Sequence, residues 1–410
     1  MILHICYEDA GGGAGIAAYR HCEAMRRVGI DARFLVIKRH HTASPFVTSL
    51  ISSKRLQKVQ SALLGLSQSF LKERFGWKNV FSYPIYGVHL SHHPWVREAE
   101  VIYLHWVAGG MMTNREVSRL LRMGKSVRWF MHDMQPITGG CHHALTCEGY
   151  KADCSCCPML PKKPLGLNLA KRQLAIRKRL WDKYPNLEAY TPSRWLASCV
   201  EASSLWKERK VFVFPNVIDT DKFHFVDKQT ARRFLGIHSE RKLILFGAVG
   251  IDNAYKGWNY LRDALQQLDP EQYEAVIFGN EQLGLDKELG ITCHFLGFLS
   301  DEYSLILAYN AADVFVSSSL AENYPNVIIE AMACGLPCIG FNIGGIPEQI
   351  DHLRNGYLAE ARNPQSLADG IHYICSLSEE EYAKMQKEAR RFVEETVSYK
   401  RYNKSLKSHR

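Results

Sequence analysis

Short apolar runs alternate with amphipathic segments along most of the chain. In the first half, the runs stand at residues 2–7, 31–38, 100–107, 127–133 and 187–193. Continuous apolar strands that are separated by helices are typical of a parallel sheet covered by helices on both faces. The first half of the chain therefore predicts an α/β unit.

The same alternation starts again after residues 211–223. The later apolar runs stand at 242–250, 274–280, 291–299, 312–319 and 337–342. The chain thus predicts a second α/β unit of similar construction. We expect one domain over 1–215, a second over 216–385, and a helix with a basic tail over 386–410 that packs back on the first domain.

The composition is that of a soluble globular protein. The chain has 410 residues, of which 46% are hydrophobic and 23% charged, and its formal net charge is +9. No apolar run reaches the roughly 20 residues that span a bilayer, and the first residues lack the features of a signal peptide. We therefore expect a cytoplasmic protein, and the positive charge favours an anionic partner.

Two basic amphipathic segments leave a further role open. Residues 52–75 place apolar side chains on one helical face with lysines and arginines beside it, and residues 169–183 are similarly basic. Helices of this kind lie on anionic membrane surfaces. They also pack against sheets with their charges in solvent. On the first interpretation the protein sits peripherally on the inner face of the plasma membrane, and the second is equally compatible with the residues.

Glycines precede a predicted helix in each half of the chain. Gly12 and Gly13 follow the first strand, where backbone N–H groups can approach a phosphate. A plain strand-to-helix turn would need the same residues, and the loop matches neither the dinucleotide nor the P-loop pattern. In the second half, Lys256 and Gly257 stand in the corresponding place, and a lysine there can supply a point charge to a diphosphate.

The stretch "AENYPNVIIEAMACG" at 321–335 predicts a helix over about 325–334. Glu322 lies in the loop before this helix, where Asn323 can serve as the cap. Glu330 lies inside the helix among apolar residues, and a buried carboxylate is costly unless it is hydrogen-bonded or paired. We therefore expect a hydroxyl-rich ligand at Glu330.

Five of the twelve cysteines crowd into residues 141–157. Within this loop Cys154 and Cys157 have the pair spacing of a zinc knuckle. Four thiolates would close a tetrahedral structural zinc site without an open position for catalysis, and the candidates are Cys141, Cys147, Cys154 and Cys157. One disulfide or a set of reduced thiols fits the same residues.

The order of these motifs resembles one known family of enzymes. The glycine loop, "HD" at 132–133, "PNVIDT" at 215–220, "KG" at 256–257 and "ENYPNVIIEAMACGLP" at 322–337 follow one another as in the retaining GT-B glycosyltransferases of the GT4 group. The resemblance covers almost the entire chain. The cysteine loop is similar to that of a subset resembling colanic-acid and O-antigen glycosyltransferases. The resemblance implies two Rossmann-like domains that face each other across a cleft, the first for the acceptor and the second for a nucleotide-sugar.

The resemblance also implies roles for single residues. His132 and Glu322 would act at the transferred sugar, Lys256 at the diphosphate and Glu330 at the ribose, and no cofactor would be needed for catalysis. The implied donor-binding residues are Gly12, Gly13, Lys256, Phe298, Leu299, Asn323, Tyr324, Pro325, Asn326, Val327 and Glu330.

Two features depart from this pattern. Many relatives carry an arginine six residues before the lysine, and here that position is Gly250. Residues 219–221 form a D-x-D, the metal-binding signature of a different glycosyltransferase architecture. Because they fall in the segment between the predicted domains, we interpret the D-x-D as a coincidence.

The resemblance further implies transfer of a hexose with retention from a UDP-sugar, or alternatively a GDP-sugar. The expected acceptor is a lipid-linked oligosaccharide, on the way to an exopolysaccharide or lipopolysaccharide. Another GT-B enzyme, such as a UDP-sugar epimerase, is the first alternative. A basic zinc-knuckle nucleic-acid-binding protein is the second, and it would need aromatic residues interleaved with its basic patch. We expect no nucleic-acid partner.

Overall fold

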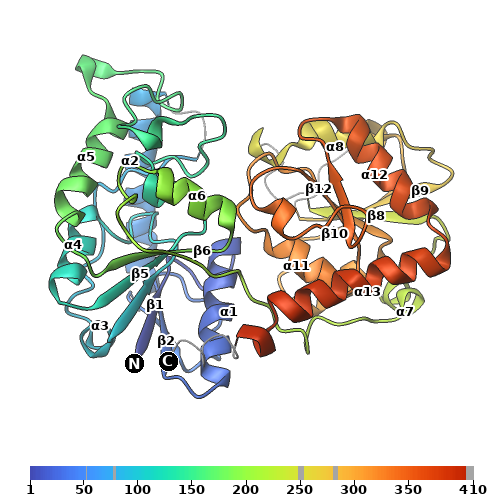
Figure 1. Cartoon of the computed structure of the whole chain (residues 1–410), viewed down its shortest axis with the longest axis horizontal. Helices are drawn as coiled ribbons and strands as arrows, with labels where there is room; N and C mark the ends of the chain where they lie inside the picture. The colour runs from blue at the N-terminus through green and yellow to red at the C-terminus, as the bar shows by residue number, and fades with distance from the viewer. Residues whose placement is uncertain (52, 77–79, 248–253, 280–284, 403–410) are drawn as a thin grey trace. The chain divides into compact units, whose positions relative to one another are not determined.

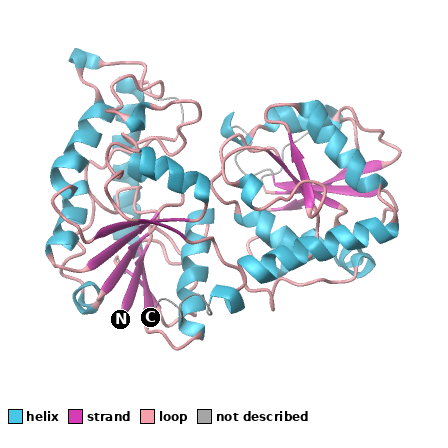
Figure 2. Cartoon of the chain, in the orientation of Figure 1, coloured by secondary structure: helices cyan, strands magenta, loops and turns pink. Residues whose placement is uncertain are grey.

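The chain divides into two compact units between Asn216 and Val217. The computed structural model describes residues 1–51, 53–76, 80–247, 254–279 and 285–402. Gly250 and the last part of the expected basic tail lie outside the described residues. Within each unit, helices flank a central parallel sheet on both faces (Figure 2).

The first unit is built on a seven-stranded sheet in the order β3-β2-β1-β4-β5-β6-β7. The strands are β1 (Ile2–Ile5), β2 (Ala32–Val36), β3 (Val47–Ser49), β4 (Val101–Leu104), β5 (Ser126–Phe130), β6 (Leu187–Thr191) and β7 (Val211–Val213). All neighbouring strands in this order pair in parallel. The helices are α1 (Gly13–Arg27), α2 (Lys54–Phe75), α3 (Pro94–Glu98), α4 (Asn114–Arg122), α5 (Leu169–Trp181) and α6 (Arg194–Ala202).

The second unit has a six-stranded sheet in the order β10-β9-β8-β11-β12-β13. The strands are β8 (Lys242–Gly247), β9 (Tyr273–Phe278), β10 (Cys293–Gly297), β11 (Val314–Ser317), β12 (Cys338–Phe341) and β13 (Gly356–Ala359). The helices are α7 (Lys228–Phe234), α8 (Trp258–Leu265), α9 (Leu285–Leu289), α10 (Glu302–Ala311), α11 (Asn326–Ala333), α12 (Pro364–Ser376) and α13 (Glu379–Thr396). Short 3-10 turns also occur, at η1 (Gln135–Ile137), η2 (Gly149–Lys151), η3 (Pro164–Gly166), η4 (Ala254–Lys256) and η5 (Ile346–Glu348).

The second sheet has a separate hydrophobic core on each face. Leu243 and Leu245 of β8 enter one buried cluster, and the residues between and after them, Ile244 and Phe246, enter the other. Successive side chains of a strand point to opposite faces, so an uninterrupted apolar run supplies both cores. The apolar runs in the sequence therefore predicted the sheet correctly.

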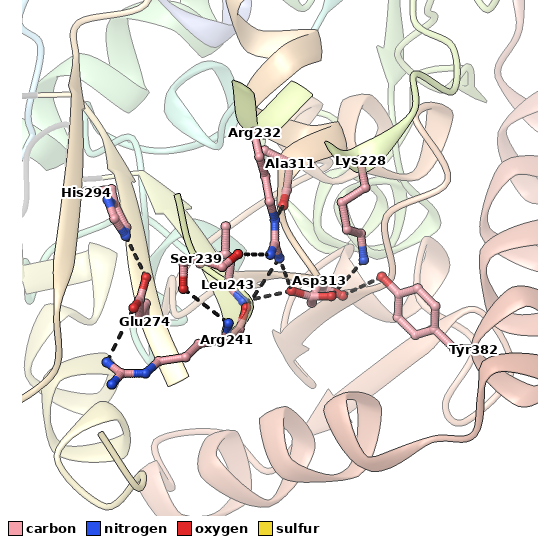
Figure 3. Close-up of polar contacts among 10 residues, drawn as sticks. All are labelled: Lys228, Arg232, Ser239, Arg241, Leu243, Glu274, His294, Ala311, Asp313 and Tyr382. Atoms are coloured by element: carbon pink, nitrogen blue, oxygen red, sulfur yellow. Dashed lines mark hydrogen bonds and ion pairs between the residues drawn. The ribbon is translucent and has the colours of Figure 1, made fainter. Parts of the chain in front are cut away.

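A buried ion network fastens α7 to this sheet (Figure 3). The carboxylate of Asp313 accepts hydrogen bonds from Lys228 Nζ at 2.7 Å, Arg232 at 2.9 Å and the backbone N–H of Leu243 at 2.8 Å. The hydroxyl of Tyr382, on α13, donates to the backbone carbonyl of Asp313 at 2.7 Å. Because each charge has a partner, burial of this network is tolerated.

The C-terminal helix α13 belongs to the second unit, where it runs alongside α11 (Figure 1). It begins with a capping box formed by Ser378 and Glu381, and its residues Ala389 and Val393 pack into the core beside α11. The expected packing of residues 386–410 on the first domain stays a prediction.

The structure differs from the predicted elements mainly at strand ends. The strands β4 and β5 stop at Leu104 and Phe130, so that His105 and His132 lie in the loops that follow. Short strands β3, β7 and β13, with 3, 3 and 4 residues, were not predicted. Runs this short give no periodicity to detect.

Candidate active-site loops at the carboxyl ends of the strands

Each sheet has a point where the chain reverses the direction in which it adds strands. In the second unit this point lies between β8 and β11, and in the first between β1 and β4. Ligands of open α/β sheets bind outside the carboxyl ends of the strands at such a point. The loops after β8 and β11 in one unit, and after β1 and β4 in the other, are therefore the candidate sites.

Three loops of the second unit pack tightly at this edge. A Cβ on Gly257 would lie 2.0 Å from the carbonyl oxygen of Ser318, and one on Gly344 would lie 2.0 Å from that of Glu322. Both glycines also have positive φ angles, of +67° and +55°. Only glycine allows these backbones to approach so closely. The packing holds the loops that follow β8, β11 and β12 against one another.

This packing brings Lys256 and Glu322 into contact. Lys256 Nζ donates to Glu322 Oε1 at 2.7 Å, and the two side chains are 35% and 19% exposed. Burial opposes the charge of Lys256, but the Coulomb attraction and hydrogen bond of Glu322 outweigh it and raise the pKa of the lysine. The two groups that the sequence assigned to the diphosphate and the sugar thus form one partly exposed ion pair.

Glu330 is 4% exposed and already has a partner within the protein. The hydroxyl of Tyr309, on α10, donates to Glu330 Oε2 at 2.9 Å. The sequence argument that burial of this carboxylate requires a bound ligand is therefore wrong, because the protein itself supplies a hydrogen-bond donor. Sequence analysis missed Tyr309 because it lies on another helix, 21 residues earlier, within an unremarkable apolar segment.

The N-cap residue of helix α11 is Pro325, whose side chain gives no capping hydrogen bond. The expected N-cap residue, Asn323, lies two residues earlier. The side chain of Gln349 donates instead to the carbonyl oxygen of Pro325 at 3.1 Å and fixes the entry to the helix. Asn323, Tyr324 and Asn326 are each less than 10% exposed. The remaining residue of this predicted segment, Val327, packs against the core.

The predicted base-binding residues lie apart from this cluster. Phe298 and Leu299 follow β10, the edge strand of the sheet. Phe298 is 63% exposed, whereas Leu299 packs against the core. The D-x-D at 219–221 is part of the local fold, since Asp219 accepts from the backbone of Asp221 at 3.0 Å.

In the first unit, the glycine loop lies close to an acid. Gly12 is the N-cap of α1 and Gly13 its first residue. A Cβ on Gly12 would lie 3.5 Å from Glu8 Oε1, and one on Gly11 would lie 3.2 Å from Glu8 Oε2. This carboxylate would repel a phosphate at the N-terminus of the helix. The arrangement is better suited to hydroxyl groups than to a phosphate.

His132 stands at the carboxyl edge of the same sheet and is half-buried. Its Nε2 lies 2.9 Å from Nδ1 of His105, and His105 in turn contacts His4. Burial lowers the pKa of His132 to about 4, although the neighbouring Asp133 opposes this shift. The carboxylate of Asp133 itself binds His142 Nδ1 at 2.6 Å. Sequence analysis missed His4 and His105, whose only signal was an imidazole inside an apolar run.

The four candidate zinc ligands, Cys141, Cys147, Cys154 and Cys157, line one pocket. Burial raises the pKa of the Cys141 thiol to about 12, and the other three thiols add to the rise against a hydrogen bond from Thr138. All twelve cysteines are free thiols. As the side chains lie, no group of three or more His, Cys, Asp or Glu among the described residues could hold a metal ion. Structural zinc in this loop stays a prediction.

The two basic helices of the first unit differ in the exposure of their apolar faces. Helix α5 buries Leu169, Leu174, Arg177 and Trp181, so its apolar face packs inside the first unit as the packing interpretation expects. Helix α2 instead turns an apolar stripe outward, with exposed fractions of 55–69% at Leu56, Val59, Leu63, Leu66 and Phe70. No helix within the described part of the chain has the length and hydropathy to cross a membrane.

Comparison with known proteins gives a family match within the second unit and structural neighbours for the fold of the whole chain. Residues 227–392 match the family model of the glycosyl transferases group 1. An uncharacterized glycosyltransferase of Methanocaldococcus jannaschii is 32% identical over 205 residues, which are 47% of this chain and 52% of that protein. The chain spans about half the length of the curated relatives it matches.

Two solved structures share the architecture of the whole chain. Anabaena HepE in complex with UDP and glucose has a TM-score of 0.62 at 17% identity, covering 100% of this chain and 98% of its own. WaaG, a glycosyltransferase involved in lipopolysaccharide biosynthesis, has a TM-score of 0.63 at 14% identity, covering 99% and 98%. The resemblance found in the sequence is confirmed: the chain has the GT-B fold of two Rossmann-like domains, and residues 227–392 match the family model of the group 1 glycosyltransferases.

Proposed function

We propose that the protein is a retaining hexosyltransferase that uses a UDP-sugar in preference to a GDP-sugar. The observation that carries the proposal is the Lys256–Glu322 pair, which lies at the switch point of the unit that matches the glycosyltransferase family. The bound UDP of the Anabaena structure supports the choice of nucleotide.

In this proposal the second unit binds the donor. Lys256 faces the diphosphate, and Glu322 orients the hydroxyls of the transferred sugar. Glu330 binds the ribose, and the first backbone N–H groups of α11 contact the phosphate. Negative charge develops on the leaving diphosphate, and a fixed lysine and a helix N-terminus lower the free energy of that state. The loop after β10, with Phe298 and Leu299, lies beside the base.

Ligand-induced thermal stabilisation tests the donor assignment. UDP-glucose, UDP-galactose and GDP-mannose are each added to the full chain at increasing concentration. A ligand at 100 times its Kd stabilises the folded state by about 2.7 kcal/mol. Lys256→Met should abolish the shift, and Lys287→Met, which changes an exposed lysine of the same unit, should not. The proposal is overturned if no nucleotide-sugar shifts the transition of the wild type, or if Lys256→Met responds as the wild type does.

The acceptor is, in our proposal, a lipid-linked oligosaccharide at an anionic membrane. The apolar stripe of α2 faces outward, and the exposed Arg55, Lys58, Lys72 and Arg74 lie on the same helix. Apolar burial combined with attraction between basic side chains and anionic lipids is the mode in which such helices bind a bilayer surface. The involvement of the WaaG protein in lipopolysaccharide biosynthesis agrees with such an acceptor.

Vesicle co-sedimentation tests this surface. Vesicles of phosphatidylglycerol and phosphatidylcholine should bind the full chain, and vesicles of phosphatidylcholine alone should bind much less of it. Leu63→Glu with Leu66→Glu should remove binding. Leu165→Glu is the matched control, because Leu165 is 99% exposed but lies in the η3 turn and not on α2. Binding that is equal for the α2 variant and the control would contradict the membrane assignment.

A further inference from the structure

Three histidines form a continuous chain at the carboxyl edge of the first sheet. Nδ1 of His4 lies 2.9 Å from Nε2 of His105, and Nδ1 of His105 lies 2.9 Å from Nε2 of His132. In both pairs the rings are stacked with centroids 5.2 Å apart and interplanar angles of 17° and 24°. The three residues come from the adjacent strands β1, β4 and β5 or the loops that directly follow them.

Burial favours the neutral form of all three imidazoles in the folded protein. His4 and His105 are 0% and 2% exposed. Burial lowers the pKa of His4 to about 3, that of His105 well below its ordinary value, and that of His132 to about 4. A neutral imidazole has one donor and one acceptor nitrogen. His105 therefore donates to one neighbour and accepts from the other, and both bonds point in the same direction along the chain.

The inner end of the chain favours one of the two directions. Nε2 of His4 is buried and has no hydrogen-bond partner. If the bonds pointed inward, this nitrogen would carry a buried N–H without an acceptor, the rarer kind of orphan group in folded proteins. If they point outward, only a lone pair is left without a partner. The outward direction has His4 donating to His105 and His105 donating to His132.

We propose that His4 and His105 hold His132 in one orientation and one tautomer, in which Nδ1–H is the only group that His132 can offer to a ligand. His132 then donates a hydrogen bond to a sugar oxygen and does not act as a base. The identity of this ligand rests on the proposed function, whereas the tautomer is a property of the protein alone. His4 and His105 are positioning residues, because they act on the ligand only through His132.

Nitrogen NMR of the full-length protein tests the tautomer without any ligand. With ¹⁵N-labelled histidine, long-range correlation spectra distinguish Nδ1–H, Nε2–H and the imidazolium. We expect His132 as the Nδ1–H form throughout pH 6–8, assigned by its loss in His132→Gln. An Nε2–H form or an imidazolium at His132 would overturn the proposal. Absence of any transferase activity would overturn the proposed function and leave this measurement unaffected.

Substitution of His105 tests the positioning role. Asn places a polar group where Nδ1 of His105 stands and can still reach His132. Gln places it near the position of Nε2, toward His4, and Leu removes both bonds. With UDP-glucose hydrolysis as the assay, we expect kcat to fall roughly 10- to 100-fold in His105→Leu and His105→Gln. The KM should change little, and His105→Asn should recover most of the activity.

Equal kcat in the Leu and Asn variants would overturn the positioning role. Circular dichroism and thermal unfolding identify a variant that has lost its fold. If His105→Leu does not fold, the ratio of the Gln to the Asn variant supplies the same comparison, and a ratio of one overturns the role.

Discussion

The carboxyl edges of the two sheets carry opposite electrostatic arrangements at equivalent places. In the second unit the edge holds a partly exposed ion pair, Lys256 and Glu322. In the first unit it holds a chain of histidines, with pKa values lowered by burial to about 3 at His4 and about 4 at the half-buried His132. The same fold thus carries an ion pair at the edge of one sheet and a chain of hydrogen-bonded histidines at the edge of the other.

The largest expected change to the electrostatic contrast between the two units would come from a metal ion bound in the cysteine loop. A divalent cation with four thiolates would place a net charge of −2 in the first unit, near the buried Arg177. Burial lowers the pKa of Arg177, and Coulomb interactions with Cys154 and Cys141 oppose this shift. The four sulfurs would have to move closer together than they lie here. Structural zinc in zinc-finger peptides contributes about 10–16 kcal/mol of binding free energy.

We predict one zinc ion per chain by elemental analysis of protein purified without chelator. Cys147→Ser should reduce the zinc content and lower Tm by several degrees. Cys199→Ser is the control, because Cys199 lies on α6, outside the set of four. Protein with no bound metal, and with the same Tm before and after chelation, would refute the zinc prediction.

Acid should unfold the first unit through its buried histidines. The pKa of His4, His21, His105 and His132 is lowered by burial in the folded state. Between about pH 6.5 and pH 4 the unfolded chain therefore binds more protons than the folded one, and the free energy of unfolding falls as the pH falls. Each such histidine contributes about 1.4 kcal/mol per pH unit in this window and nothing above it.

Urea titration at pH 7.5 and pH 5.5 measures this loss. Tryptophan fluorescence reports mainly on the first unit, where Trp129, Trp181 and Trp206 are buried. His21→Leu removes one buried histidine, so the free energy of unfolding should vary less steeply with pH by the contribution of one histidine. His92→Leu, at an exposed position, should not change this pH dependence. A free energy of unfolding that is the same at both pH values would contradict the lowered pKa values of these histidines.

The ion pair of the second unit should matter for the reaction more than for stability. Glu322→Gln keeps the shape of the side chain but removes its charge, so that Lys256 loses its partner and the sugar loses an acceptor. We expect kcat/KM for UDP-glucose to fall about 10²- to 10³-fold, the usual loss when one preorganised electrostatic group is removed. Because the pair is partly exposed, Tm should change little.

A double-mutant cycle with Lys256→Met decides whether the two residues act as a unit. Coupled residues give a double variant that is no worse than the poorer single variant, whereas independent residues give losses that add in free energy. Additive losses would mean that Lys256 and Glu322 contact different parts of the substrate and that their ion pair exists only without a ligand. Glu302→Gln, which removes an acid paired with Lys222 elsewhere in the same unit, is the control.

The sequence predicted the two α/β units and the residues of the second edge, but not their partners. Apolar runs mark strands because burial on both faces requires them. The stretch around Glu322 could be identified because its motif is contiguous. Tyr309, His4 and His105 are brought to their sites by strand order and helix packing, which local patterns do not encode. The choice between α2 and α5 as the outward helix likewise depends on tertiary packing, since both have basic amphipathic sequences.

The smallest predicted effect comes from Tyr309→Phe, which tests whether Glu330 and Glu322 have different roles at the edge of the second sheet. Tyr309→Phe removes the hydroxyl that donates to Glu330 at 2.9 Å and leaves the aromatic packing in place. A hydrogen bond to a charged group contributes about 1.5–3 kcal/mol, so Tm should fall by a few degrees. If Glu330 binds the ribose in the proposed way, UDP affinity should fall by about tenfold or less, because Glu330 itself remains.

Tyr303→Phe is the matched control for this substitution, since Tyr303 is 70% exposed on the same helix. Calorimetric titration with UDP gives the affinity of each variant, and Glu330→Gln should lose more affinity than Tyr309→Phe does. If Tyr309→Phe loses stability while Glu330→Gln keeps full affinity for UDP, Glu330 serves the packing of α10 on α11 and not the ribose. The charged edge would then consist of Lys256 and Glu322 alone, and the two glutamates would have separate roles in spite of their shared motif.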